Sequence, residues 1–322
     1  MKTSFLLKLA LVTMPVLAAS TAFAEYPDKP ITLLVGYPPG GAADLTARLF
    51  AEKLGKQLNQ TVVVENKSGA GATISTSNLA RAKPDGYTLG IGTANSFGVD
   101  QYLYRVKYKP EDFTPISQLV SSPLILAVNN DIPAETVGEL KELIKQEPNK
   151  FNYSSSGIGG SPHIAGLMLE KEIGKEILHV PYKGGADSMT AIVSGEVKYS
   201  FGTAASVLPL GKANRYRMLG VTSLEKSPIA PDLPALNESG LPGFTYEIWF
   251  GLLAPKGLPD TIADKLFEAT RKALQDDEMR EKLLIEGNIV EASASRQEFG
   301  EFVIKKGNET LERLKASGVT LN

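Results

Sequence analysis

Three glycine-rich turns carry the residues that could bind a ligand, at positions 37–44, 154–163 and 181–187. Each follows a strand-like stretch and precedes a helical pattern. The amino end of a helix presents unpaired backbone N–H groups and a partial positive charge, so it attracts anions. Glycine allows a ligand to approach the backbone closely. These turns predict that a small anion is bound mainly by main-chain groups.

The first turn reads Tyr-Pro-Pro-Gly-Gly-Ala-Ala-Asp and contains neither Lys nor Arg. We therefore expect an anion to be held here by the backbone of Gly40, Gly41 and Ala42. Asp44 falls in the first turn of the following helix. There it either complements the helix dipole as a capping carboxylate or touches the ligand. Tyr37 either belongs to the core or covers the ligand.

The second turn has the densest cluster of donors in the chain, with hydroxyl and N–H groups crowded at one helix start. Pro162 suits the first turn of that helix. The alternative is a flexible turn that ends in a serine cap. The histidine of this turn either donates to the ligand or has a structural capping role. The predicted ligand contacts are Ser155, Ser156, Gly157, Gly160, Ser161 and His163.

The third turn adds Lys183 and Gly184 to the candidate contacts. Lys183 is the one cation in the three turns, and it either steers an anion electrostatically or lies on the surface. Weaker candidates are Thr93 and Asn95, which follow a third strand-like stretch, and Thr203, which follows another.

The elements that must position these turns alternate between strands and helices. Short apolar runs predict strands at 31–35, 61–65 and 87–91, and helical spacing predicts helices at 43–58 and 73–82. This order implies a parallel, doubly wound sheet whose ligand edge lies at the carboxyl ends of its strands.

A second unit of the same kind begins near residue 125. Its expected strands cover 124–128, 151–154, 177–180, 198–202 and 217–222, with helices at 137–147 and 164–173 and a further element at 189–194 that continues the alternation. After a proline-rich connector the pattern predicts a strand at 246–253, a helix at 261–286, a short strand at 288–291 and a helix at 296–317.

The number and order of these predicted strands and helices indicate an α/β fold of two doubly wound lobes joined by a two-strand hinge. Lobe 1 is expected to contain residues 25–122 and 243–322, and lobe 2 residues 123–242. The alternative is two consecutive domains without a return of the chain.

The amino terminus has the pattern of a secretory signal. Lys2 and Lys8 accompany an apolar run at 9–19, and Ala22-Phe23-Ala24 supplies a cleavage pattern. The run is shorter than a membrane span of roughly 20 residues. We therefore interpret residues 1–24 as a removed signal peptide and expect a periplasmic protein; the alternative is an uncleaved tether.

Composition excludes several classes of function. Removing the two signal lysines lowers the formal net charge from −2 to −4, which argues against a nucleic-acid partner. The chain has no Cys and only two His, so Cys nucleophiles and Cys-based zinc sites are excluded and a His-rich metal site is not expected. We expect no cofactor.

Enzyme motifs are also missing from the sequence. The segment 36–41 lacks the G-x-G-x-x-G spacing of a dinucleotide site, and neither G-x-S-x-G nor a P-loop occurs. A hydrolase in which His163 activates Ser156 or Ser161 is the enzymatic alternative, but no third member of a triad is evident. The favoured function is binding without catalysis.

From about Tyr26 to the carboxyl end, the chain resembles the Bug-type periplasmic receptors, which are the solute-binding subunits of tripartite tricarboxylate transporters. The resemblance depends on the order and spacing of many short motifs. They are Tyr26-Pro27, 29–31, 39–41 with Asp44, Ala47-Arg48, Glu65-Asn66, 69–71, 84–89, Ser156-Gly157 with Gly159 and His163, 179–184, and Trp249 with 251–255.

The resemblance implies a type II periplasmic-binding-protein fold whose cleft closes on the ligand, with the turns around Gly40 and Ser156 forming a carboxylate pincer. It also implies a di- or tricarboxylate, acidic amino acid or aromatic carboxylate ligand and delivery to a pair of membrane permease subunits. A monomer is expected. Sensing for a kinase is an alternative to transport. Ser68, Ala72, 185–187 and 201–203 depart from the family pattern and leave the ligand's identity open.

Overall fold

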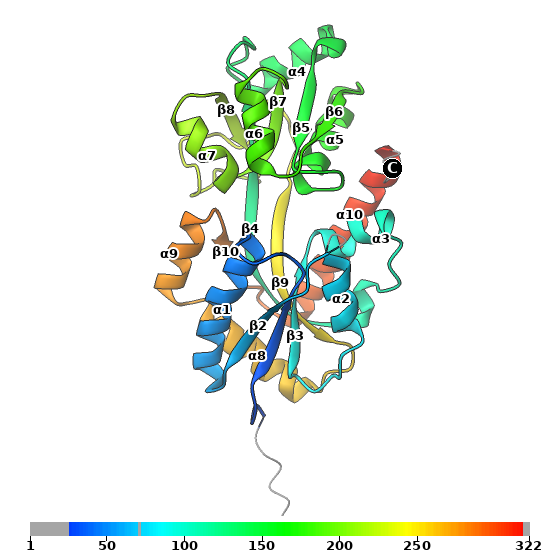
Figure 1. The fold of residues 1–322 in the computed structure, drawn as a ribbon, viewed down its shortest axis with the longest axis vertical. Helices are drawn as coiled ribbons and strands as arrows, with labels where there is room; N and C mark the ends of the chain where they lie inside the picture. The colour runs from blue at the N-terminus through cyan, green and yellow to red at the C-terminus, as the bar shows by residue number, and fades with distance from the viewer. Residues whose placement is uncertain (1–25, 70–71, 318–322) are drawn as a thin grey trace, which may run out of the picture.

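The computed structural model describes residues 26–69 and 72–317, so the predicted signal peptide lies outside the described residues. Within this part of the chain, ten strands form a sheet in the order β2-β1-β3-β9-β4-β7-β5-β6, and β10 and β8 also pair with β4. Helices cover the sheet in each half of the molecule (Figure 1). The mixed α/β architecture confirms the predicted fold class.

The first half is built on three parallel strands, β1 (Ile31–Val35), β2 (Val62–Asn66) and β3 (Thr88–Thr93). The short strand β10 (Ile289–Val290) also belongs to this half and pairs antiparallel with the long strand β4, which is described below. The helices of this half are α1 (Ala42–Leu58), α2 (Thr73–Ala80), α3 (Val99–Leu103), α8 (Asp260–Ala273), α9 (Asp277–Ile285) and α10 (Arg296–Ser317). The strand–helix alternation expected from residue 31 to 93 is present.

The second half repeats this construction with the parallel strands β5 (Asn152–Ser155), β6 (Leu178–Pro181) and β7 (Tyr199–Thr203). Strand β8 (Arg217–Val221) pairs antiparallel with β4. The helices are α4 (Val137–Gln146), α5 (Ser161–Ile173), α6 (Gly185–Val193) and α7 (Ala204–Lys212). Helix α7 has no counterpart among the elements predicted from the sequence.

Two long strands, β4 (Phe113–Val128) and β9 (Glu247–Pro255), run between the halves (Figure 1). The first part of β4 pairs with β9 in the first half, as far as Pro123 opposite Glu247, and the last part pairs with β7 and β8 in the second half. We call the region around Pro123 and Glu247 the crossing. The lobe boundaries predicted from the sequence remain a prediction.

Each half has its own apolar core. In the first half, Leu33, Phe50, Leu89, Leu252 and Leu266 belong to one buried cluster, in which helix α1 and helix α8 cover the same face of the sheet. A second cluster fills the second half around Leu126, Tyr153 and Leu169. Val99 of α3 and Leu314 of α10 join this second cluster, although sequence position assigns both to lobe 1.

One predicted helix, 261–286, is wrong, because the structure divides it into α8 and α9. The carboxylate of Asp276 accepts a hydrogen bond from Met279 N at 2.9 Å and caps α9. An aspartate side chain at a helix start replaces an intrahelical partner. The apolar spacing continues through Ala273 and Met279, so periodicity alone does not detect this break. Among the described residues, no helix is both long and apolar enough to cross a membrane.

Candidate functional site

The sheet registers bring the predicted turns to one place. Strand β3 is antiparallel to β9 and its last residue, Thr93, pairs with Phe250, nearer the crossing than the earlier pair of Gly90 with Leu253. Strand β1 is parallel to β3. The carboxyl ends of β1, β2 and β3 therefore face the crossing from the first half.

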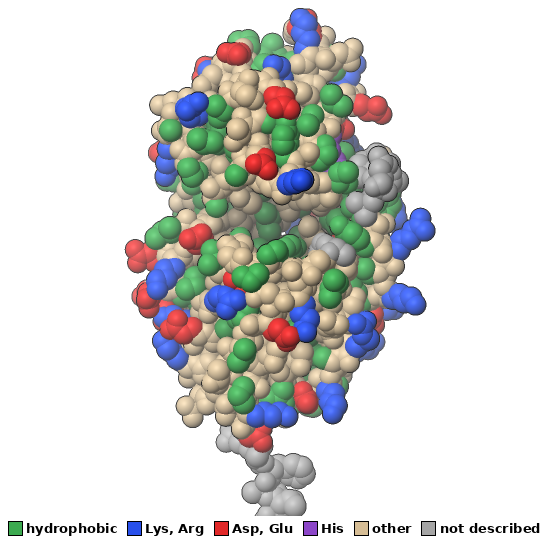
Figure 2. All heavy atoms as spheres, in the orientation of Figure 1, with side chains coloured by type: hydrophobic (Ala, Val, Ile, Leu, Met, Phe, Trp, Pro, Cys, Tyr) green, Lys and Arg blue, Asp and Glu red, His purple; other side chains and the backbone are tan. Residues whose placement is uncertain are grey.

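The second half mirrors this geometry. Thr203 at the end of β7 pairs with Leu124, the β4 residue next to the crossing, and β5 and β6 run parallel to β7. The carboxyl ends of these strands therefore face the crossing as well. Figure 2 shows the surface hollowed between the two halves at this level. The turns that follow β1, β5, β6 and β7 border this cleft.

A hydrogen-bond network centred on the buried Asp44 holds the first turn. Asp44 Oδ2 accepts hydrogen bonds from Gly40 N and Arg48 Nε, both at 2.9 Å. Its Oδ1 accepts from Asn66 Nδ2 at 2.8 Å, and the same amide donates to Tyr37 O at 3.0 Å. Asn66 was not predicted as a site residue, although it ends β2 at the same sheet edge as the turn.

The sequence left two roles open for Asp44, a structural one and contact with the ligand, and its hydrogen bonds favour the structural role. Asp44 is 2% exposed, and its hydrogen bonds occupy both carboxylate oxygens. Burial acts to raise the pKa of Asp44, but hydrogen bonds from Arg48, Gly40 and Asn66 outweigh it and lower the pKa. The backbone of Gly40, Gly41 and Ala42 remains exposed beside it. The network therefore holds the turn in one conformation, with Gly41 and Ala42 exposed at its surface.

The second turn is held from within in a similar way. Ser155 is fully buried, and its Oγ lies 3.1 Å from Gly157 N and 2.7 Å from His179 Nε2. His163 is 2% exposed, and its Nδ1 accepts a hydrogen bond from Gly159 N at 3.0 Å. Ser156 and Gly160 are partly exposed at the turn. Ser155 and His163 therefore shape this turn from the buried side.

Polar groups at the end of β3, and in the segment that follows it, lie beside the first turn. Thr93 Oγ1 lies 3.3 Å from Tyr37 Oη and 3.2 Å from Ser96 Oγ, and burial raises the pKa of Tyr37 to about 12. Asn95 Oδ1 is buried without a hydrogen-bond partner among the described residues. Such an orphaned acceptor is unusual in a folded protein and suits a donor supplied by ligand or water.

Tyr246, beside the crossing, is a candidate site residue that sequence reasoning missed. Its hydroxyl is buried and has no hydrogen-bond partner in the described part of the chain. Burial raises the pKa of Tyr246, and the neighbouring Ser161 side chain acts to lower it. In the sequence Tyr246 is simply the first residue of an apolar strand, so no local signal separates it from the core.

Helices that begin at the cleft lack side-chain caps. The N-cap residues of α1, α5, α6 and α7 are Gly41, Gly160, Gly184 and Thr203, and none of their side chains accepts a hydrogen bond from the helix start. Thr203 Oγ1 instead lies 3.2 Å from Ser206 Oγ. The N–H groups of a first turn need partners. A bound anion can supply them at these four starts.

Helices that begin away from the cleft differ. Thr136 caps α4 by accepting from Glu139 N, Asp276 caps α9, and Ser295 accepts from Glu298 N at the start of α10. Helix α8 follows Pro259 and has no side-chain cap, so the contrast holds for three of these four helices. Helices α2 and α3, which follow β2 and β3, also lack side-chain caps. Most vacant caps therefore belong to helices that follow strands whose carboxyl ends face the crossing.

The third turn contributes less than the other two. Gly184 is partly exposed at the start of α6, whereas Lys183 is exposed and lines a shallow groove with Asp187, Thr190 and Glu196 on the outer side of α6. This position favours the surface interpretation of Lys183. Its contact with a ligand remains a prediction.

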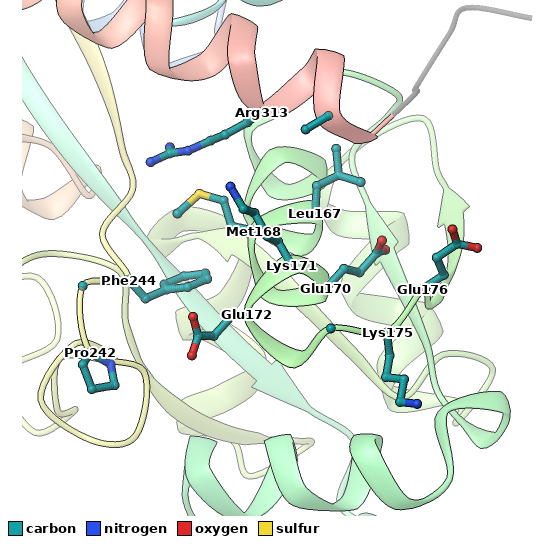
Figure 3. Close-up of a pocket in the computed structure, with 13 residues that line it drawn as sticks. Leu167, Met168, Glu170, Lys171, Glu172, Lys175, Glu176, Pro242, Phe244 and Arg313 are labelled. Atoms are coloured by element: carbon teal, nitrogen blue, oxygen red, sulfur yellow. The ribbon is translucent and has the colours of Figure 1, made fainter.

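One cavity lies away from the cleft. It has a volume of about 740 Å³ and is bordered by α5, the connector at Pro242–Phe244 and Arg313 of α10 (Figure 3). Charges of both signs surround it, and none of the predicted ligand contacts lines it. We place the candidate site at the cleft instead, because the uncapped helix starts and the unpartnered polar atoms face that region.

Two α/β halves, joined by crossing strands and carrying glycine-rich turns at the crossing, define a two-lobed solute-binding protein. Residues 46–318 match the model of the tripartite tricarboxylate transporter family receptor. The chain belongs to this family, which confirms the resemblance seen in the sequence.

Solved structures of similar proteins agree with this assignment. The periplasmic binding protein BugD is 34% identical with a TM-score of 0.74, over 92% of this chain and 100% of its own. R. palustris Rpa4515, solved with adipate, is 30% identical with a TM-score of 0.78 over the same shares. MatC from Rhodopseudomonas palustris, solved with malate, is 28% identical with a TM-score of 0.72, over 90% of this chain and 99% of its own.

Proposed function

We propose that this protein is a periplasmic receptor that captures a small carboxylate in the cleft and delivers it to the membrane subunits of a tripartite tricarboxylate transporter. The observation that carries the proposal is the convergence of uncapped helix starts from both halves on one cleft. Similar proteins have been solved with adipate and malate, both dicarboxylates. We therefore favour a dicarboxylate among the possible ligands.

Main-chain N–H groups would grip the carboxylate from both halves at once. The amides of the exposed residues Gly41 and Ala42 would supply one side, and the amides at the start of α5, at Ser161 and His163, would supply the other. Moving a two-state equilibrium from 1:99 to 99:1 requires about 5.5 kcal/mol of differential affinity. Several hydrogen bonds to a charged group, at about 1.5–3 kcal/mol each, are sufficient. The ligand would thereby stabilise the closed form.

The rest of the proposal concerns location, partners and chemistry. Residues 1–24 would direct export and be removed, and the mature receptor would act as a monomer with the permease subunits as its partners. We propose that it does no chemistry on the ligand. In support, His163 Nδ1 is already engaged by Gly159 N, which leaves this nitrogen unable to activate Ser156 or Ser161.

A panel of carboxylates tests the proposal directly. Adipate, malate, a tricarboxylate, an acidic amino acid and benzoate are each added to the mature protein, and binding is read by thermal shift and calorimetry. At least one should raise the melting temperature and bind with a measurable Kd, because binding to the folded state alone stabilises it. A panel without binders, together with turnover of an ester, would remove the receptor hypothesis.

Replacing Gly41→Asp tests the first turn. Gly41 has φ −82°, and a Cβ there would approach only Pro38 O, at 3.6 Å, so a side chain fits. An aspartate would place a negative charge against the ligand and occupy the vacant cap. We expect Kd to rise at least about 100-fold, equivalent to about 2.7 kcal/mol, without a fall in melting temperature, because an aspartate at the cap position stabilises a helix start. Gly41→Ala is the matched control and should bind within a few-fold of wild type.

A further inference from the structure

The two facing turns contain the same internal hydrogen bond. In α1 the third helical residue, Asp44, accepts from Gly40 N at 2.9 Å, and in α5 the third helical residue, His163, accepts from Gly159 N at 3.0 Å. In both cases a glycine with φ near +80° donates across the vacant cap position. In each turn, a side chain from the first helical turn therefore accepts a hydrogen bond from the residue before the N-cap.

The second turn has an additional support from β6. The imidazole rings of His163 and His179 stack with centroids 3.9 Å apart and an interplanar angle of 8°. His179 Nε2 lies 2.7 Å from Ser155 Oγ, which accepts from Gly157 N at 3.1 Å. The two rings also lie against Tyr153. One stacked pair therefore touches the turn at Gly159 and, through Ser155, at Gly157.

We propose that His163 and His179 form a neutral stacked pair of positioning residues that sets the conformation of the turn at 155–161 for carboxylate binding. This inference rests on the proposed function and assigns neither ring a direct ligand contact. It replaces the interpretation of His163 as a donor to the ligand. His179 was not a predicted site residue.

Charge explains why imidazole suits this position. Asp44 has Arg48, four residues later in α1, as its partner at 2.9 Å, whereas the residue four positions after His163 in α5 is Leu167. A carboxylate in place of His163 would add an unpaired negative charge next to the ligand. A neutral imidazole accepts the same hydrogen bond without that charge.

The histidines must stay neutral for this role, because an imidazolium has no lone pair with which to accept from Gly159 N. Burial lowers the pKa of His163 to about 3, helped by His179, and burial lowers the pKa of His179 to about 4. With Gly159 N donating to Nδ1, the proton of neutral His163 must be on Nε2. This tautomer is a property that can be measured directly.

Two substitutions separate the acceptor from the ring. Asparagine keeps an acceptor close to the position of Nδ1 but removes the stack, whereas phenylalanine keeps a ring and removes the acceptor. Binding is measured with adipate and malate as probes. We expect His163→Phe to raise Kd at least tenfold with a small change in melting temperature. We expect His163→Asn to bind within threefold of wild type but to melt at a lower temperature.

The same contrast applies at the partner ring, where His179→Gln should bind more tightly than His179→Phe. Wild-type affinity in His163→Phe, or equal losses of affinity in the asparagine and phenylalanine variants, would overturn the proposal. A wild-type protein that binds no carboxylate would instead count against the proposed function.

Nitrogen-15 NMR of the histidine-labelled wild-type protein gives a test that needs no variant and no ligand. At pH 7 we expect His163 to be neutral, with its proton on Nε2. A proton on Nδ1, or a charged ring, would overturn the proposal even if every variant failed to fold.

Discussion

Two buried aspartates show that hydrogen-bond partners determine whether the pKa of a buried carboxylate is lowered or raised. Asp44 is 2% exposed and has hydrogen bonds on both oxygens, so it remains charged. Asp100 on α3 is fully buried, and it accepts one hydrogen bond, from Tyr108 Oη at 3.1 Å. Its other oxygen has no partner within the described ranges. Burial raises the pKa of Asp100 to about 8, although Tyr108 acts to lower it.

Asp100 should make the protein less stable as pH rises. Its pKa is higher in the folded state than in the unfolded chain, where it is about 3.9. Its contribution to stability is therefore complete below pH 4 and is lost as pH rises toward about 8, at roughly 1.4 kcal/mol per pH unit. Asp100→Asn, which stays neutral, should show a shallower fall between pH 5 and 8 in urea denaturation and exceed wild-type stability at pH 8. Parallel pH profiles would contradict this.

The sequence predicted individual site residues where backbone chemistry is local. Gly40, Gly41 and Gly160 are predicted because a glycine between a strand and a helix has a direct physical interpretation, and the structure places each of them at a helix start. Their contact with a ligand remains a prediction. Asn66 and His179 were missed as site residues because their partners, Asp44 and Ser155, are more than twenty positions away in the chain. Such pairs depend on the sheet register, which short-range patterns do not contain.

The helices of this protein use their amino ends in two ways. Where a helix starts at the cleft, its cap position is occupied by glycine or by a threonine engaged elsewhere; three of the four helices that start away from the cleft have side-chain caps. A vacant cap leaves unpaired N–H groups, so these helices have a site for a ligand at some cost in stability. Strand order decides which starts meet.

Helix α4, which has a side-chain cap and starts away from the cleft, provides a control for the role of the vacant caps. Thr136 caps α4 and forms a capping box with Glu139, at the end of the molecule opposite the crossing (Figure 1). Thr136→Ala should therefore lower the free energy of unfolding by about 1 kcal/mol. The Kd for the carboxylate found in the panel should not change, because α4 does not border the cleft. Calorimetry that shows weaker binding in this variant would contradict the division between the two kinds of helix start.

At the scale of the whole molecule, the halves touch at one side of the cleft. Val99 of α3 and Leu314 of α10 pack into the core of the second half. A Cβ on Gly159 would lie 2.5 Å from Leu103 Cδ1 and 3.0 Å from Val99 Cγ1. The turn at 155–161 is therefore in direct contact with α3. The position of the two halves depends on this contact as well as on the crossing strands.

Gly159→Ala should wedge the halves apart. The added methyl group would meet α3, and Gly159 has φ +75°, so the substitution combines a clash with backbone strain. Gly174→Ala is the control, since Gly174 has φ +73° and no atom within 4 Å of the added Cβ. Each variant should lose about 1–2 kcal/mol from strain. Only Gly159→Ala should increase the radius of gyration in X-ray scattering and weaken carboxylate binding; equal radii in the two variants would refute this.

The sequence by itself determined the secondary-structure alternation, the α/β class and the location of the glycine-rich turns, because these depend on apolar periodicity and local backbone freedom. The tertiary structure decided which helix starts face one another, since β4 and β9 must pair in register before the carboxyl ends converge. It also decided the end of α8 at Ala273 and the stacking of His163 on His179. These features arise from contacts between distant segments, which become definite only when the chain packs.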